Sequence, residues 1–402
     1  MTSYAILIGL SLAVILSYLY NLAAQATRVP SVLLLLLSGI GLQQWGQYAG
    51  YTPQVPKTLL EIFGIVGLIM IVLEGSLDLR LSRDKVALIR RSFLAALGLL
   101  LVQAAAIGAL LHTWLATASW QTCLLNAVPL VVISSAIAIP SVASLTGEKQ
   151  EFIVYESTFS DILGIMLFNF VDQEDFAQGQ GLLTFGRGVL LIVLVAVFST
   201  VLLTFLLTRL RGHVKFFLLF SFLVLIYSLA KKLHLSSLLL VLAFGLAVNN
   251  YDLLLSTVRR WLPGLRLPAT AALALELQQL KSITAESAFL IRTFFFLLFG
   301  YSISIPSLLS APLLGEGLLV VAVLTALRFL YLRYVAKSDL LPELFIAPKG
   351  LITVLLFYSI PVQHQLGEVS ENILFVVILL TSLLMMLGLI ISHQRPTTEV
   401  EF

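Results

Sequence analysis

Hydrophobic residues occur along this chain in runs of about 20, separated by short stretches of polar residues, glycine and proline. A run of that length matches an α-helix that crosses a bilayer, whereas membrane β-strands are shorter and alternate polar with apolar residues. The pattern predicts thirteen transmembrane helices, at residues 4–24, 29–44, 58–77, 92–115, 122–145, 151–171, 188–208, 214–231, 235–250, 286–304, 314–335, 341–361 and 371–392. In the longest connection, 251–285, the stretch from Ala271 to Leu280 after Trp261 favours an amphipathic helix at the membrane interface.

The composition agrees with this pattern and excludes other classes of protein. Of the 402 residues, 59% are apolar and 11% are charged, whereas an ordinary soluble domain has about 25% charged residues. The single cysteine, Cys123, excludes a disulfide scaffold. The net charge of +3 does not indicate a nucleic-acid partner. We therefore expect an all-α polytopic membrane protein embedded in lipid, which is neither an enzyme nor dependent on a cofactor.

Basic residues are divided unequally between the two sides of the predicted membrane. If the N-terminus is outside, the cytoplasmic segments hold 17 lysines and arginines and the outer segments hold 4. Because basic residues favour the cytoplasmic side, we expect an external N-terminus, an odd number of spans and a cytoplasmic C-terminus. No basic residue precedes the first apolar run, so we expect a retained helix, although Ala24-Gln25-Ala26 resembles a signal-peptide cleavage site.

Two carboxylates, Glu156 and Asp161, fall within the sixth predicted helix. A charge inside the membrane is costly, so such side chains face the bundle interior or a watery cavity. Five positions correspond to about 140° around a helix, so the two carboxylates point in different directions. Asp161 lies at mid-span beside Ser160. A carboxylate offers oxygen ligands to a hard cation, and one removed from water holds a proton more readily. The alternative is that both carboxylates are locked in buried ion pairs and bind no ion.

Three basic residues also lie within predicted helices. Arg328 is deep in the eleventh, where it needs a carboxylate partner, and Glu156 is the best candidate for a structural ion pair. Arg292 is near the start of the tenth, and Glu61 and Glu74 are near the two ends of the third. We expect these last three side chains to reach the membrane interface.

Two predicted helices are interrupted at mid-membrane depth. The fifth contains Ser134-Ser135 and Pro140, and the twelfth contains Pro348-Lys349-Gly350. Both helices are expected to break there, because proline lacks an N–H and glycine is permissive. Their matching places, in the middle of spans four to six and eleven to thirteen, are typical of an inverted-repeat transporter. Lys349 would then offset the carbonyl ends of the half-helices at its break. A kinked but ordinary helix is the alternative for either segment alone.

These residues resemble the monovalent cation/proton antiporter superfamily, the sodium/proton exchangers. The segment Glu156-Ser157-Thr158-Phe159-Ser160-Asp161 is similar to the family's Glu-Ser-x-x-Asn-Asp-Gly, and Ala347-Pro348-Lys349-Gly350 is similar to its Gly-Leu-Arg-Gly. Arg328 is similar to a buried arginine that pairs, in relatives, with the glutamate matched by Glu156. Weaker matches are Thr27-Arg28-Val29-Pro30 and Phe299-Gly300. The chain departs from the electroneutral branch at Ser160 and at Ser134-Ser135-Ala136-Ile137, where that branch has Asn or Asp and Thr-Asp-Pro.

The resemblance implies a division of the chain and a movement. Residues 1–86 and 213–305, the latter with the interfacial segment, would form a dimerisation domain. Residues 87–172 and 306–402 would form a core domain, and 173–212 would form a linker helix. It also implies a homodimer in which the core moves like an elevator, carrying Asp161 between two water-filled funnels.

We therefore expect a secondary active antiporter that exchanges Na⁺ or K⁺ for H⁺, with Asp161 binding both in competition. Ser160, Ser134 and Ser135 would complete the shell of a transiently bound Na⁺ or K⁺. With one carboxylate at the site, we expect one proton per cation and electroneutral exchange. The alternatives are a sodium-coupled solute symporter on a related fold, and a channel or transport-inactive sensor. No long regulatory tail follows Arg395, which favours a bacterial inner membrane.

Overall fold

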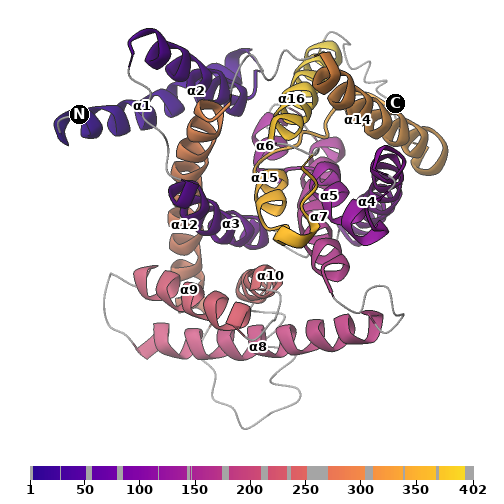
Figure 1. Ribbon diagram of the computed structural model, residues 1–402. Coiled ribbons are helices and arrows are strands. Elements are labelled where there is room, and N and C mark those ends of the chain that lie inside the picture. The colour runs from indigo at the N-terminus through magenta and orange to yellow at the C-terminus, as the bar shows by residue number, and fades with distance from the viewer. Residues whose placement is uncertain are drawn as a thin grey trace, which may run out of the picture. The chain divides into compact units, whose positions relative to one another are not determined.

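Helical structure lies over every predicted span (Figure 1). The computed structural model describes residues 3–27, 29–50, 57–78, 85–115, 117–142, 145, 147–173, 181–209, 216–232, 237–250, 270–303, 311–337, 340–367 and 371–393. The helices are α1 (Ser3–Thr27), α2 (Ser31–Tyr48), α3 (Lys57–Asp78), α4 (Val86–Trp114), α5 (Trp120–Val131), α6 (Ser135–Ser141), α7 (Glu148–Val171), α8 (Gly181–Arg209), α9 (Phe216–Lys232), α10 (Ser237–Asn249), α12 (Thr270–Tyr301), α14 (Ala311–Leu330), α15 (Leu351–Tyr358) and α16 (Glu371–His393). A π-helical turn, Tyr331–Ala336, continues α14, and a 3₁₀ turn, Val362–His364, follows α15.

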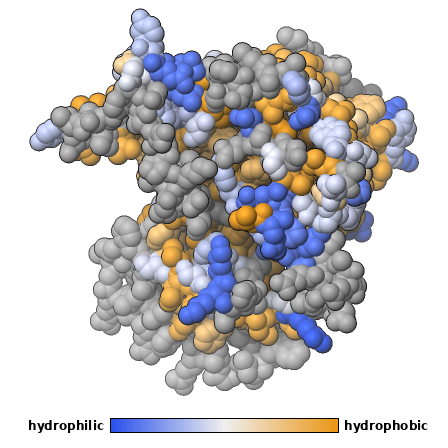
Figure 2. Space-filling model, viewed as in Figure 1, coloured by the Kyte–Doolittle hydropathy of each residue, from blue (hydrophilic) through white to orange (hydrophobic). Residues whose placement is uncertain are grey.

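Many of these helices suit a lipid environment. Six stretches of the described chain are long and apolar enough to cross a membrane: Leu7–Ala24, Val86–Trp114, Trp120–Ser141, Gln278–Tyr301, Pro312–Ala336 and Asn372–Ser392. Large apolar side chains such as Leu7 and Phe198 are exposed, and Figure 2 shows hydrophobic side chains on the outer surface. Apolar surface of this kind is solvated by lipid tails rather than water. The chain is therefore an integral membrane protein.

The chain divides into two compact units. One contains Met1–Gly64, Leu88–Gly164 and Arg292–Phe402, and the other contains Ile65–Ala87 and Ile165–Ile291. In the second unit, α10 packs against α8 and α9. The dimerisation and core domains implied by the resemblance are defined by which parts move together, whereas these two units are defined by compactness. The domain assignment therefore stays a prediction.

In the first unit, the end of α12 is packed closely against α1 and α2. A Cβ added to Gly300 of α12 would lie 2.3 Å from the carbonyl oxygen of Leu36, and one added to Gly39 of α2 would be equally close to the α12 backbone. The backbones of α2 and α12 therefore touch where both residues are glycine. Ser17 of α1 and Thr293 of α12 share a buried hydrogen bond of 2.7 Å.

The described part of the connection 251–285 differs from its prediction. A helix over Ala271 to Leu280 is confirmed, but it is not separate from the tenth predicted span, because α12 runs without a break from Thr270 to Tyr301. Residues 270–285 contain neither glycine nor proline and are rich in alanine and leucine. These residues favour a helix, and nothing in this stretch ends it. Trp261 lies outside the described residues.

The two interrupted spans break in different ways. The break in the fifth is confirmed: α5 ends at Val131 and α6 begins at Ser135. The twelfth has only one half-helix, α15, because residues 340–350 form turns and irregular chain. Both segments belong to the first unit, where α15 packs against α5.

Candidate functional site

The non-helical segments of the two broken spans are hydrogen-bonded to each other. The backbone N–H of Ser134 donates to the carbonyl oxygen of Pro348 over 2.9 Å. A Cβ added to Gly350 would lie 2.6 Å from the Ser134 hydroxyl oxygen and 2.7 Å from a methyl carbon of Ile137. The segments can therefore approach this closely only because residue 350 has no side chain. Irregular backbone inside a membrane protein is tolerated where it is buried in protein in this way.

We call the place where these two non-helical segments meet, around Ser134 and Pro348, the crossing. Asp161 lies on α7 beside this crossing and is 7% exposed. Its Oδ2 atom accepts hydrogen bonds from the Ser135 backbone N–H, over 3.2 Å, and from the Ser135 hydroxyl group. Its buried Oδ1 atom has no hydrogen-bond partner among the described residues. A buried polar atom without a partner is costly. Asp161 therefore has one oxygen held by protein and one that is available for a proton or a cation.

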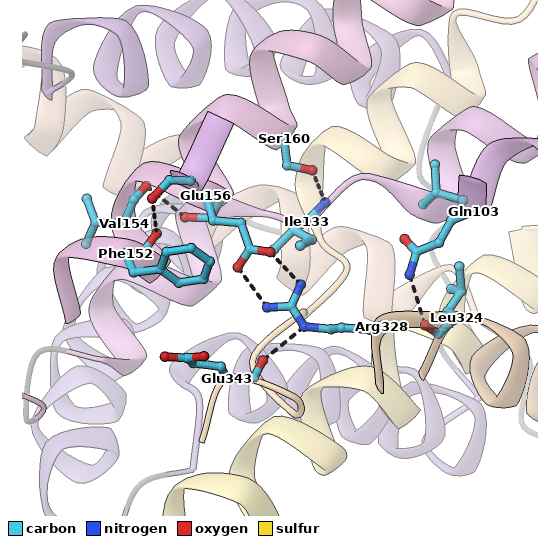
Figure 3. A network of polar contacts seen from close by, with 12 residues as sticks. Gln103, Ile133, Phe152, Val154, Glu156, Ser160, Leu324, Arg328 and Glu343 are labelled. Carbon is cyan, nitrogen blue, oxygen red and sulfur yellow. Dashed lines mark hydrogen bonds and ion pairs between the residues drawn. The ribbon is translucent and has the colours of Figure 1, made fainter. Parts of the chain in front are cut away.

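The two other predicted ligand residues have different surroundings. The Ser134 hydroxyl oxygen is buried and, within the described chain, makes no hydrogen bond. The Ser160 hydroxyl oxygen accepts a hydrogen bond of 2.9 Å from the backbone N–H of Ile133 (Figure 3). Because α5 ends before Ile133, that N–H belongs to the non-helical segment. Ser160 therefore supports the break between α5 and α6, whereas Ser134 has a hydroxyl group available to an ion.

Lys349 contacts a different helix end from the predicted one. Lys349 is 1% exposed, and its ammonium group donates to the carbonyl oxygen of Val131, the last residue of α5, over 2.7 Å. The prediction that it offsets two half-helices at its own break is wrong in its position, because no helix precedes it. The carbonyl end of a helix attracts a cation. Lys349 therefore ties the twelfth segment to the end of α5.

Glu156 of α7 and Arg328 of α14 form a bidentate ion pair (Figure 3). Both N–O distances are 2.7 Å, and the two side chains are 1% and 2% exposed. The Arg328 Nε–H also donates to the backbone carbonyl oxygen of Glu343 over 2.9 Å. The fork of a guanidinium group matches a carboxylate in this geometry. The structure thus brings together the two residues that the sequence indicated as a pair.

A small cavity is lined by both Arg328 and Lys349. Its volume is about 20 Å³, and the polar side chains that line it belong to Gln103, Thr325, Arg328, Lys349 and Thr381. A space of this size holds one water molecule. The described residues contain no cluster of three or more His, Cys, Asp or Glu that could hold a metal ion.

The sequence did not indicate the contacts of two charged residues near the site. Glu343 is buried, and its backbone holds Arg328; no pattern around it indicated this. The prediction that Arg292 reaches the interface is wrong, because α12 begins well before residue 286 and Arg292 donates to the carbonyl oxygen of Ala136 over 3.3 Å. Glu74 is half-buried in α3, and the Glu61 side chain lies outside the described part.

Comparisons with known proteins agree with this architecture. The family model described as the transmembrane sodium/hydrogen exchanger matches residues 10–393. A structure of the sodium proton antiporter MjNhaP1 from Methanocaldococcus jannaschii at pH 8 is 20% identical, with a TM-score of 0.66, and covers 96% of this chain and 100% of its own. An electron-microscopy structure of the same antiporter is 18% identical, with a TM-score of 0.67, and covers 100% of both chains. No protein of curated function matches the sequence. The structural likeness shows a shared fold.

Proposed function

Because the chain belongs to the sodium/hydrogen exchanger family, we propose that it is a secondary active antiporter that exchanges Na⁺ or K⁺ for H⁺. In this proposal Asp161 binds the cation and the proton in turn, so the two compete for one carboxylate. A hard monovalent cation prefers oxygen ligands. These ligands come from the Asp161 carboxylate, the hydroxyl groups of Ser134 and Ser135, and nearby backbone carbonyl oxygens. Ser160 completes the shell by supporting the segment between α5 and α6.

The free Oδ1 atom of Asp161 carries this proposal. It is buried and has no partner among the described residues, while Oδ2 is held by Ser135. A proton or a cation at Oδ1 would relieve the cost of burying an unpaired oxygen. The same atom can accept either one, and this is the property that a competitive exchange site requires.

The ion pair supports an exchange of one proton for each cation. Glu156 is engaged through both of its carboxylate oxygens with Arg328, so in this proposal the second carboxylate of α7 carries no proton. A site with one carboxylate returns with H⁺ after releasing Na⁺ or K⁺. One positive charge then crosses in each direction, and the exchange is electroneutral.

The movement and assembly in this proposal follow from the family. The core, residues 87–172 and 306–402, would move like an elevator against a dimerisation domain of residues 1–86 and 213–305. Two copies of the chain would associate through the dimerisation domain. In this proposal the N-terminus is external, and the protein lies in a bacterial inner membrane.

The test is proton movement in proteoliposomes that contain a pH-sensitive dye. Adding external Na⁺, K⁺ or Li⁺ to the wild-type protein should change the internal pH, and Asp161→Asn should abolish this change. Asp172→Asn, at the end of the same helix, is the control for losing a carboxylate and should exchange normally. Normal exchange by Asp161→Asn would mean that Asp161 is not the carrier. No response of the wild type to any of the three cations would refute antiport.

A further inference from the structure

Arg292 lies far inside α12, and it contacts the element that contains the ion site. It lies nine positions before the end of the helix at Tyr301, in the apolar stretch Gln278–Tyr301. A charged side chain at such a place needs polar partners. One of them is the backbone carbonyl oxygen of Ala136 in α6, 3.3 Å from a terminal guanidinium nitrogen.

The carbonyl of Ala136 needs an external donor because of the sequence of α6. In an α-helix it would accept from the N–H of residue 140, four positions later. Residue 140 is proline, which has no N–H. The acceptor is therefore left without its helical partner, and Arg292 supplies a donor from another helix.

Ala136 directly follows Ser135, the residue that holds Asp161. The Ser135 N–H and hydroxyl group both donate to Oδ2 of Asp161. The whole of α6 has only seven residues, Ser135–Ser141. A short half-helix has little hydrogen bonding of its own to fix its position. The bond from Arg292 is thus one residue away from the contacts that orient the carboxylate.

The part of α12 that carries Arg292 is itself held in place. The next residue, Thr293, shares a buried hydrogen bond of 2.7 Å with Ser17 of α1. Two turns later, Gly300 brings the backbone of α12 into contact with Leu36 of α2. Arg292 therefore extends from a firmly packed helix to a short one.

We propose that Arg292 is a positioning residue for the ion site. By donating to Ala136, it holds α6 so that Ser135 binds Oδ2 of Asp161 and Oδ1 is left to the transported cation. This role rests on the proposed function, because it concerns the same carboxylate. In this role, Arg292 affects the affinity for the cation, although α12 supplies no ligand to the ion.

Two possible roles of Arg292, positioning α6 and repelling the cation by its charge, have opposite effects on cation binding. Arg292 is positively charged, so if it acted only through its charge, its removal would strengthen cation binding and lower the KM. If it acts by holding α6, its removal loosens the carboxylate and raises the KM. The sign of the change therefore separates the two roles.

The experiment measures exchange by the full-length protein in proteoliposomes at a series of Na⁺ or K⁺ concentrations. Arg292→Met should raise the KM for the cation roughly tenfold, the usual effect of losing a hydrogen bond to a charged group, and change the maximal rate less than about twofold. Arg292→Lys keeps a donor and the charge, and should recover most of the affinity. Arg333→Met removes an exposed arginine and should leave the KM unchanged.

Pro140→Ala provides a second, independent test. It gives residue 140 an N–H that can satisfy the carbonyl of Ala136 within α6. In the Pro140→Ala background, Arg292→Met should therefore change the KM less than about threefold, a non-additive result typical of residues that share one partner. Thermal unfolding in detergent checks that each variant is folded.

Three results would overturn this role of Arg292. They are a lowered or unchanged KM in Arg292→Met, the same increase in both backgrounds, and no recovery by lysine. Failure of the proposed function is recognised separately, because the wild type would then show no cation-dependent proton movement.

Discussion

The ammonium group of Lys349 lies 2.7 Å from the carbonyl oxygen of Val131, across the crossing of the two broken spans. Val131 is the last residue of α5, so its carbonyl lacks the helical N–H that would otherwise bind it. Together with the bond between Ser134 and Pro348, this contact joins the fifth and twelfth spans at the level of Asp161.

Replacing Lys349 should weaken the crossing. Lys349→Met removes a charged donor that is buried, so the free energy of unfolding should fall by roughly 1.5–3 kcal/mol. Lys349→Arg keeps the charge and should lose less stability. Thermal unfolding in detergent, followed by size-exclusion chromatography, measures the difference. Equal stability of Lys349→Met and the wild type would show that the contact contributes little.

Glu156→Gln should harm folding more than cation affinity. The substitution leaves the Arg328 guanidinium buried without its carboxylate, which typically costs about 3–5 kcal/mol. The yield of monodisperse protein and its unfolding temperature should both fall. The double substitution Glu156→Gln with Arg328→Met removes both charges and should be less damaging than Glu156→Gln alone. A stable Glu156→Gln protein with only a shifted cation KM would argue against a structural pair.

Gly350→Ala should disturb the crossing through its volume alone. The added Cβ would lie 2.6 Å from the Ser134 hydroxyl oxygen, a contact that forces the two segments apart. We expect a loss of about 1–3 kcal/mol in stability, as for other overpacked sites. Gly367→Ala is the control, because nothing lies within 4 Å of a Cβ there. Adding Ser134→Gly should restore part of the stability, and melting curves of the four proteins test this.

Competition at one carboxylate predicts how cation affinity depends on pH. As the pH falls, protons occupy a larger fraction of Asp161, so the apparent KM for Na⁺ or K⁺ rises. Where the protonated form predominates, one pH unit changes the proton concentration tenfold and should raise the KM up to tenfold. Initial exchange rates at several pH values, with equal pH on both sides of the membrane, measure this slope. A KM that is independent of pH would contradict a shared site.

Ser135→Ala separates the two contacts that hold Asp161. It removes the hydroxyl donor but keeps the backbone N–H, which donates to Oδ2 over 3.2 Å. The cation KM should therefore change by roughly threefold to tenfold while exchange persists, since one hydrogen bond contributes about 1 kcal/mol. Ser141→Ala, at the far end of α6, is the matched control and should have a smaller effect. Complete loss of exchange in a folded Ser135→Ala protein would indicate that the hydroxyl group is indispensable.

Sequence reasoning correctly paired Glu156 with Arg328, because a charge inside a membrane needs a partner. Asp161, Glu156, Arg328 and Lys349 could be selected because a charge in an apolar helix requires a reason. It failed at Arg292, where the error came from the start of α12. No proline or glycine marks a boundary between residues 270 and 301 other than Gly300 near the end, and the helix therefore begins earlier than hydropathy indicated.

The number and order of the apolar helices and the break in the fifth span follow from local properties. Helix length is set by the thickness of a bilayer and by where backbone donors are missing, and both can be read along one chain. Only the tertiary structure decided three further features. These are the oxygen of Asp161 that stays free, the helix end that Lys349 contacts and the carbonyl group that Arg292 satisfies. Each of these depends on groups that are far apart in the sequence and meet across packed helices, at distances that hydropathy and spacing do not specify.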